Sequence, residues 1–482
     1  MISSARKLWL AAVMTLFMLA ATSCNDQLRQ FIIPIPKPGG DPGNLANSIV
    51  LSTNPAASSN GSTMHINVSG DTIAGVVATG PNPVFFDIAA SRVFVINGNN
   101  TITTYIALLP TTPPFSTVVL PGSTSGAIGG GTSSTGNLFT ANEGSGDSNV
   151  ISANLLASVA TVTVGSNPVS IAGNANNAKV YVVNNGSNNV TVVGTADNTV
   201  VKTIAVGSAP IWAVMSPNGA DVFVVNQGSN NMSVIDTGSD SVIATITLGI
   251  SPNFAFYEPN RQRVYVSNTG ENSVSVIKAD GIDPNANPPV LPVLLKTVTG
   301  LSGPPVSVAA LADGSKAYAA LGGCPAGTNH TNLLANLGSC NGSLVSVIDA
   351  TALIQRTTIP VGAGVVSVAT SSDSRRAYAV SAHDTTTITS NVASPQLPGA
   401  GTCTTGASTI TCTFSTPSVY DINTSTDTTI PRTTDPSVTP PVATFLAPSQ
   451  DPNCTPPIAV KFNTTVPIPC AGQIPFMVRT FP

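Results

Sequence analysis

The stretch that decides the fold is Val180-Tyr-Val-Val-Asn-Asn-Gly-Ser-Asn-Asn-Val-Thr-Val192. It returns as Val222-Phe-Val-Val-Asn-Gln-Gly-Ser-Asn-Asn-Met-Ser-Val234 and as Val264-Tyr-Val-Ser-Asn-Thr-Gly-Glu-Asn-Ser-Val-Ser-Val276, each copy starting 42 residues after the one before. In each copy two runs of alternating residues flank a segment with Asn and Gly, as in two antiparallel strands joined by a turn. A strand-based repeat of this length predicts a β-propeller with one blade per repeat.

One complete repeat contains four short strands. They are expected at Val169–Ala172, Lys179–Val183, Val190–Val193 and Val200–Val206, with Asn-, Gly- and Asp-containing segments between them. These residues favour turns because Gly adopts positive φ, and Asn and Asp bond to nearby backbone. A sheet of this kind has two apolar faces and needs neighbouring blades to cover both. We therefore predict an all-β propeller of four-stranded antiparallel blades.

The repeat resembles that of the YVTN-type β-propeller proteins. The resemblance is strongest in the second-strand motifs Val180–Asn184, Val222–Asn226 and Val264–Asn268. Degenerate copies of the motif lie on both sides, at Val93–Asn97, Leu138–Asn142, Ala317–Leu321 and Ala377–Ser381. The resemblance implies the fold but little about activity, because the family includes archaeal surface-layer proteins, periplasmic proteins and relatives of redox-enzyme subunits.

Seven copies of the second strand predict a seven-bladed propeller over residues 63–432. One segment does not fit this number, because Met64–Gly80 has the pattern of third and fourth strands without a first half. The C-terminal residues could complete that blade through Val442–Leu446 or Ile458–Phe462, and the ring would then have eight blades. Strands from both termini would also remove the exposed sheet edge.

Charged residues make up 8% of the chain, and its formal net charge is -4. Typical soluble domains contain about 25% charged residues, so Ser, Thr, Asn and Gly solvate this protein instead. No basic patch is available for nucleic acid or an anionic membrane, and we expect neither as an electrostatic partner. The 42% of hydrophobic residues is sufficient for a large core.

The N-terminus has the pattern of an export signal. Basic residues precede the apolar run Leu8–Ala21, which is shorter than the roughly 18–20 residues of a spanning helix. The following Ala21-Thr-Ser-Cys24 resembles a bacterial lipobox. We expect a signal peptide over residues 1–23 and lipidation of Cys24, so that a lipoprotein faces the periplasm or the cell surface. The alternative is ordinary secretory cleavage nearby.

Two segments outside the repeats differ from them in composition. Residues 24–62 are rich in Pro, Gly, Ser and Asn, which is typical of a flexible tether. Residues 433–482 are rich in Pro, and we expect either an ordered tail that helps to close the ring or a poorly ordered end. The propeller over residues 63–432 lies between them.

The seven cysteines agree with an exported protein. Without the lipidated one, six remain in three near pairs, and disulfides form readily in exported compartments. Six cysteines allow 15 connectivities, of which we expect nearest-neighbour pairing. The expected disulfide cysteines are Cys324, Cys340, Cys403, Cys412, Cys454 and Cys470. Zinc binding is the alternative, but no CxxC motif occurs, and we predict no metal site.

Three insertions lengthen individual repeats. Gly322–Gly342 and His383–Pro417 lie between second and third strands, and Asp280–Leu294 lies between a third and a fourth strand. Loops of the first kind emerge beside the blade-to-blade connections, on the face where propellers usually bind ligands. We expect a raised wall there, with His383 and Asp384 as the best acid–base candidates. The alternative is that the insertions have no function.

The first strand of each blade lines the central channel, and its second residue offers a candidate binding slot. Phe85, Trp212 and Phe254 occupy this slot, the last two in adjacent blades, and could stack on a sugar ring or another flat ligand. The alternative is packing between blades. The other repeats place Ile128, Ser170, Ser307 and Ser367 in the slot.

A second set of equivalent residues consists of the asparagines that end five second strands. A ring of them could bind a ligand or a cation, but we expect each to bond the backbone of its own turn. They are Asn97, Asn142, Asn184, Asn226 and Asn268.

The sequence contains no nucleophile elbow, HExxH, phosphate loop or haem-attachment CxxCH motif. We therefore predict a monomeric, non-enzymatic, envelope-anchored scaffold that uses no cofactor and presents a binding surface to a protein or glycan. The alternatives are a secreted lactonase- or hydrolase-like propeller enzyme and a structural surface-layer component.

Overall fold

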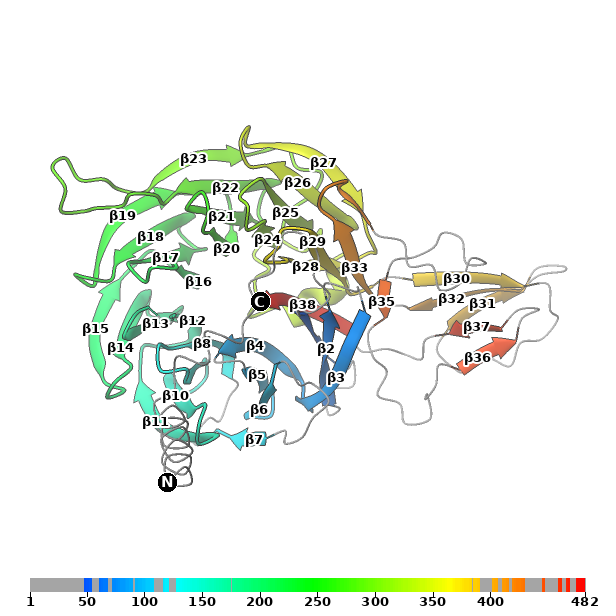
Figure 1. Cartoon of the computed structure of the whole chain (residues 1–482), viewed down its shortest axis with the longest axis horizontal. Helices are drawn as coiled ribbons and strands as arrows, with labels where there is room; N and C mark the ends of the chain where they lie inside the picture. Colours follow the sequence, from blue (N-terminus) through cyan, green and yellow to red (C-terminus); the bar gives the residue numbers. More distant parts are fainter. Residues whose placement is uncertain are drawn as a thin grey trace, which may run out of the picture.

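Eight antiparallel sheets, seven of four strands and one of four strands with a short fifth, surround a central channel in the computed structural model (Figure 1). In each blade the first strand lies innermost, and the innermost strands of successive blades contact one another around the ring. The chain is described at residues 47–53, 60–67, 72–89, 92–107, 116–120, 127–174, 176–383, 385–390, 401–405, 410–415, 418–429, 444–446, 458–461, 465–468 and 474–481.

The first blade joins the two ends of the described chain. Its strands, from the channel outward, are β38 (Ile474–Phe481), β1 (Asn47–Thr53), β2 (Asn60–Asn67) and β3 (Thr72–Pro81).

Blades two to five each consist of four consecutive strands. These are β4 (Pro83–Ala89), β5 (Arg92–Asn97), β6 (Thr101–Ile106) and β7 (Ser116–Val119); β8 (Ala127–Thr132), β9 (Leu138–Asn142), β10 (Asp147–Ser152) and β11 (Ala157–Thr163); β12 (Pro168–Ala172), β13 (Lys179–Asn184), β14 (Asn189–Gly194) and β15 (Val200–Ala205); and β16 (Pro210–Met215), β17 (Asp221–Asn226), β18 (Asn231–Asp236) and β19 (Ser241–Thr247).

Blades six to eight contain the insertions. Their strands are β20 (Pro252–Glu258), β21 (Arg263–Asn268), β22 (Ser273–Lys278) and β23 (Val293–Val298); β24 (Ser307–Ala310), β25 (Lys316–Leu321), β26 (Leu344–Asp349) and β27 (Ile354–Pro360); and β28 (Val365–Thr370), β29 (Arg376–Ser381), β33 (Ser418–Asn423) and β34 (Thr428–Thr429), with β35 (Thr444–Leu446) also paired to β33.

The blade number corrects the prediction of seven, and the eight-bladed alternative is the one observed. The segment Met64–Gly80 does contribute third and fourth strands, as β2 and β3. Its first half comes from β38 and β1, not from Val442–Leu446 or Ile458–Phe462. Strand β1 lies within residues 24–62, which the composition assigned to a tether. Two short strands from opposite chain ends carry no repeat of their own, so the periodicity did not reveal them.

Closure of the ring depends on the pairing of β1 between β38 and β2. Val50 lies opposite Val478 on one side and Met64 on the other. Ile49, Val50 and Leu51 have no exposed surface. Without β38, strand β1 would expose its edge and blade eight would lose its neighbour in the channel, because β28 packs against β38.

We expect truncation after residue 473 to abolish the cooperative unfolding transition or to lower its midpoint by at least about 10 °C, because apolar blade faces and a sheet edge become exposed. Differential scanning calorimetry measures this, and a chain lacking only Pro482 is the control. An unchanged transition in the truncated chain would show that β38 does not hold the ring closed.

Neighbouring blades are also linked by a polar latch at their outer turns. Tyr181 of β13 is completely buried and donates a hydrogen bond to Asp240 Oδ1 of the next blade at 2.7 Å. Lys179 Nζ lies 2.7 Å from the other oxygen of this carboxylate. Lys316 and Tyr318 make the same contacts with Asp427 of blade eight. The tyrosine of the repeat motif therefore packs in the core and orients a carboxylate between blades.

The asparagine that ends five of the second strands clamps the third strand of the same blade. Asn226 Nδ2, for example, donates to Asn231 Oδ1 at 2.8 Å and to Ser233 Oγ at 3.0 Å. The partners are side chains, not the turn backbone expected from the sequence. Gly207 packs on this amide so closely that a Cβ there would lie 2.7 Å from the Asn226 Cγ. The same clamps, with the donor first, are Asn97 with Thr101 and Thr103, Asn142 with Asp147 and Asn149, Asn184 with Asn189 and Thr191, and Asn268 with Ser273 and Ser275.

A buried histidine joins the first blade to the second. His65 Nε2 on β2 lies 2.8 Å from the Tyr105 hydroxyl on β6, which also contacts Thr63 Oγ1 at 2.6 Å. His65 and Tyr105 have no exposed surface. Burial lowers the pKa of His65 from 6.5 to about 4, so the folded protein holds this side chain neutral at pH values where the unfolded chain protonates it.

We expect the contribution of His65 to the free energy of unfolding to be fully retained above pH 6.5 and to fall by up to about 3 kcal/mol between pH 6.5 and 4. The reason is that in this range the imidazole binds a proton in the unfolded state but not in the folded state. Urea unfolding at several pH values measures this slope. Glutamine at this position cannot titrate, so the free energy of unfolding of H65Q should depend less steeply on pH. The stability of each protein at pH 7.5 is the reference for its own slope. An equal slope in H65Q would assign the pH dependence to other groups.

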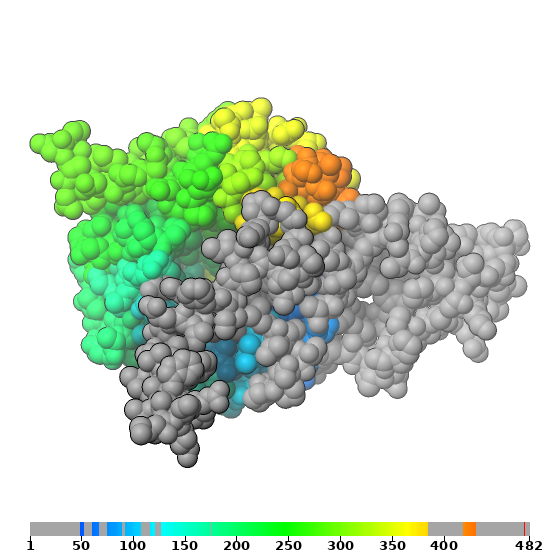
Figure 2. Space-filling view, in the orientation of Figure 1, coloured from blue at the N-terminus to red at the C-terminus, as the bar shows by residue number. Residues whose placement is uncertain are grey.

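The insertions add peripheral elements. The loop between β22 and β23 projects outward from the ring (Figures 1 and 2). The insertion after β29 contains the sheet of β30 (Thr385–Ser390), β31 (Gly401–Thr405) and β32 (Ile410–Ser415), and β36 (Ile458–Lys461) pairs with β37 (Thr465–Ile468). The helical elements of the described chain are α3 (Leu333–Asn336) and η1 (Leu337–Ser339). Within the described residues, no helix is long and apolar enough to span a membrane.

Candidate functional site

The two faces of the ring carry different loops. One face, here called the connection face, carries the blade-to-blade connections and the loops between second and third strands. These two kinds of loop are hydrogen-bonded to each other: Gln227 N, for example, donates to Ala209 O at 3.0 Å. The other face, here called the turn face, carries the turns between first and second strands and those between third and fourth strands. These turns are also hydrogen-bonded to each other: Thr237 N, for example, donates to Ala220 O at 2.9 Å. Each loop class therefore reaches only one mouth of the channel.

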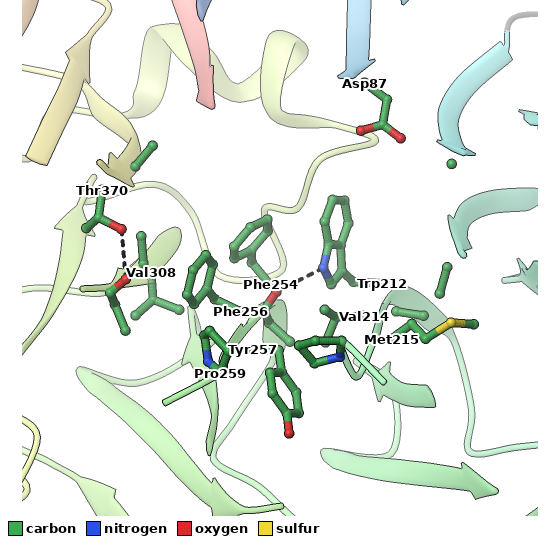
Figure 3. Close-up of a pocket in the computed structure, with 18 of the residues that line it drawn as sticks. Asp87, Trp212, Val214, Met215, Phe254, Phe256, Tyr257, Pro259, Val308 and Thr370 are labelled. Atoms are coloured by element: carbon green, nitrogen blue, oxygen red, sulfur yellow. Dashed lines mark hydrogen bonds between the residues drawn. The ribbon is translucent and has the colours of Figure 1, made fainter. Parts of the chain in front are cut away.

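The central channel contains a cavity of about 550 Å³ between the innermost strands. It extends to the turn face, because residues of the first turn in five blades line it: Gly173, Pro217, Pro259, Ala312 and Ser372. Five aromatic side chains line the cavity: Phe85, Trp212, Phe254, Phe256 and Tyr257. Figure 3 shows the last four together on one side of it. A compact ligand could therefore enter from the turn face and meet an aromatic wall.

The three aromatic residues expected in the binding slot do come together. The ring centroids of Trp212 and Phe254 lie 4.7 Å apart, and those of Phe85 and Trp212 lie 6.4 Å apart. Trp212 Nε1 donates to Ala255 O at 3.1 Å, which orients the indole between two blades. Trp212 is 9% exposed. These side chains pack between blades and line the cavity at the same time.

The register of the inner strands corrects one residue of the slot and adds another. In blade three Gly129, not Ile128, lies opposite the residue before the terminal Asn, as Ser170 does in blade four. In blade one the equivalent residue is Met477. The signal for Met477 was present in the sequence, because Pro475-Phe-Met477 has the Pro-x-apolar pattern of Pro210-Ile-Trp212.

A strap, defined as residues Gly322–Gly342, covers the channel on the connection face. The disulfide Cys324–Cys340 joins its two ends, as predicted. His330 reaches β12, where its Nε2 lies 2.8 Å from Val169 O, and its ring centroid lies 5.0 Å from that of Trp212. A space of about 80 Å³ remains between the strap and the inner strands. The strap thus covers Trp212 from the connection face, while the larger cavity lies toward the turn face.

His383, one of the two predicted acid–base candidates, contacts the strap. Its Nε2 lies 2.5 Å from Leu337 O. Asp384 lies outside the described residues. His383 is not among the residues that line the cavity, so its described contact supports the strap and does not place it in a catalytic group.

The remaining predicted cysteines are described only in part. Cys403 of β31 and Cys412 of β32 lie directly opposite each other in the antiparallel register. Cys24, Cys454 and Cys470 lie outside the described residues, as does the predicted signal peptide over 1–23.

The cavity has little charge on its walls. Asp87 is the one ionisable acidic or basic side chain, tyrosine apart, among the described residues that line it. Burial, followed by the charges of Asp221, Glu258 and Asp280, raises the pKa of Tyr257 to about 12. In the described part of the chain, no three His, Cys, Asp or Glu side chains are grouped so that they could hold a metal ion. Sequence reasoning missed Asp87, Phe256 and Tyr257, although Phe256 follows Phe254 at the two-residue spacing of one strand face.

Comparison with known proteins supports the fold. No protein-family model and no curated protein matches the sequence. Dihydro-heme d1 dehydrogenase NirN in complex with DHE is similar in structure, with a TM-score of 0.57 and 13% identity over 82% of this chain and 74% of NirN.

Two further solved structures are similar at lower TM-scores. Hydrazine synthase of Kuenenia stuttgartiensis has a TM-score of 0.45 and 18% identity, over 62% of this chain and 93% of that one. A functionally unknown protein of Desulfotomaculum acetoxidans DSM 771 has a TM-score of 0.47 and 14% identity, over 65% and 94%. At these identities the similarity to NirN supports the propeller fold alone.

We expect C324S/C340S to expose Trp212, because the ends of the strap are then no longer joined. The chain has two tryptophans, Trp9 and Trp212, so a W9F background makes fluorescence specific for Trp212. Acrylamide quenching should rise at least about twofold when the strap loosens, since Trp212 is now buried. S339A, at an exposed strap residue, is the control. Equal quenching in a folded double variant would show that the disulfide does not keep the strap closed.

Proposed function

We propose that this protein is a non-enzymatic β-propeller of the cell envelope that binds a compact ligand, the terminal part of an envelope glycan, in its central cavity. The observation that carries the proposal is the aromatic wall of Trp212, Phe254 and Phe85 beside a cavity of about 550 Å³. This volume lies in the usual range for small-ligand sites.

The geometry favours a glycan over the other expected partner class, a folded protein. The aromatic wall lies between the innermost strands, where a single sugar ring can enter but a protein surface cannot. Sugar rings stack on aromatic faces through their apolar C–H surfaces, and the indole of Trp212 provides the largest face here. The hydroxyl-bearing residues Thr132, Ser371 and Ser372 line other parts of the cavity and can bond sugar hydroxyls.

The envelope location rests on two features. The N-terminal residues 1–24 have the pattern of a lipoprotein signal, and the disulfide Cys324–Cys340 is compatible with an oxidising, exported compartment. A non-catalytic role is favoured because His383, the best acid–base candidate, contacts the strap.

W212A should weaken glycan capture by more than about tenfold, about 1.4 kcal/mol, because the main stacking surface is lost. A glycan array that includes peptidoglycan fragments identifies the ligand, and calorimetry measures its affinity. W212F, which keeps an aromatic face, should retain most of the affinity.

Thermal unfolding of W212A separates binding from stability. A variant that unfolds early but binds its glycan normally while folded would assign Trp212 to the core alone. An array on which no glycan binds the wild-type protein would reject the glycan as the ligand.

A further inference from the structure

Among the described residues, the walls of the cavity combine five aromatic side chains with one carboxylate. Aromatic side chains line it from three inner strands: Phe85, Trp212, Phe254, Phe256 and Tyr257. Asp87 adds a carboxylate, and no Lys, Arg or His side chain is found among the described residues that line the cavity. Among the described residues of the cavity wall, an anionic ligand would therefore meet a carboxylate and no cationic side chain.

Asp87 and the aromatic wall face the same space. Phe85 and Asp87 are two residues apart on β4, so they share the face of the strand that points into the channel. Asp87 extends from β4 toward the side chains of Trp212 and Phe254 (Figure 3). A ligand held against the aromatic wall would thus have a carboxylate on the turn-face side.

A second acidic residue follows the aromatic side chains of β20 directly in the chain, although it is not among the residues that line the cavity. Glu258, which follows Tyr257 at the end of β20, is completely buried and accepts hydrogen bonds from the backbone of Asn260 and Arg261. The positive charges of Arg261 and Arg263 act on Glu258, and both side chains bond to the outer turn of blade seven. Burial is the first cause of the raised pKa of Tyr257, and the negative charges of Asp221, Glu258 and Asp280 add to it.

From this combination we infer that the cavity binds an organic ammonium ion, with the cation over the aromatic faces and Asp87 as its counter-charge. The negative face of an aromatic ring attracts a cation, most strongly for tryptophan, and the attraction grows when water is excluded. A primary or quaternary ammonium on a glycan or on a free small molecule supplies the same chemistry. The inference rests on the proposed function only in that the cavity is a binding site.

The test uses two probes of the same shape that differ in charge, choline and its neutral carbon analogue 3,3-dimethyl-1-butanol. Titration of the full chain, followed by calorimetry and by Trp212 fluorescence in the W9F background, should show choline binding at least about tenfold more tightly. D87N should weaken choline by about tenfold and leave the neutral analogue unchanged. D197N removes an exposed carboxylate outside the cavity and controls for net charge.

A second variant tests the aromatic contribution without changing a charge. F256L keeps an apolar side chain but removes a ring, so choline affinity should fall severalfold while the neutral analogue binds as before. Glucosamine and glucose form a second matched pair, in which the sugar ring is constant and the ammonium is not.

Each outcome separates this inference from the glycan proposal. Equal affinity for choline and the neutral analogue, or equal effects of D87N and D197N, would overturn the ammonium site and leave the glycan proposal standing. A choline preference that needs Asp87, together with an array on which no glycan binds, would support the ammonium site and reject the glycan. If D87N does not fold, the loss of choline preference in F256L decides the result.

Discussion

The constraint on which this structure depends is that no single blade can bury both of its apolar faces. Each sheet needs a neighbour on either side, so stability comes only from a closed ring. Closure is made by β1 pairing with β38 on one side and β2 on the other, with Ile49, Val50 and Leu51 completely buried. The polar latches, such as the hydrogen bond from Tyr181 to Asp240, link neighbouring blades in addition to this pairing.

The closed ring gives the candidate site its rigidity. Residues at one position of the repeat differ around the channel: Trp212 and Phe254 are in contact and line the cavity, whereas the equivalent residues of two other blades are Gly129 and Ser170. The bond from Trp212 to Ala255 O fixes the indole across a blade boundary. The strap then closes the connection face through a contact with β12 on a different blade. Ligand access is thereby directed to the turn face.

Much of this arrangement was predictable because it repeats. The 42-residue period identified the repeated blades and the three insertions that lengthen them. It also identified the slot shared by Phe85, Trp212 and Phe254. The pairing of Cys324 with Cys340 followed from their closeness in the chain. The predicted blade number was wrong because the two inner strands of the first blade, β38 and β1, come from opposite ends of the chain. Each end of the chain contributes only one of these strands, so neither shows the repeat. The asparagine clamps were misassigned because the third strand, not the turn, presents the nearest acceptors.

The sequence by itself determined the class of fold. Alternating apolar residues between regular turns indicate strands, and the 42-residue repeat of these strands indicates equivalent sheets that stack on one another. It also placed Phe85, Trp212 and Phe254 at the channel. Only the tertiary structure decided that the ring has eight blades, that the strap covers Trp212, and that Asp87 shares a cavity with Phe256 and Tyr257. The physical reason is distance along the chain. Local pattern reports on neighbours within one strand or turn, whereas these contacts join residues on different blades, and they exist only after the ring has closed.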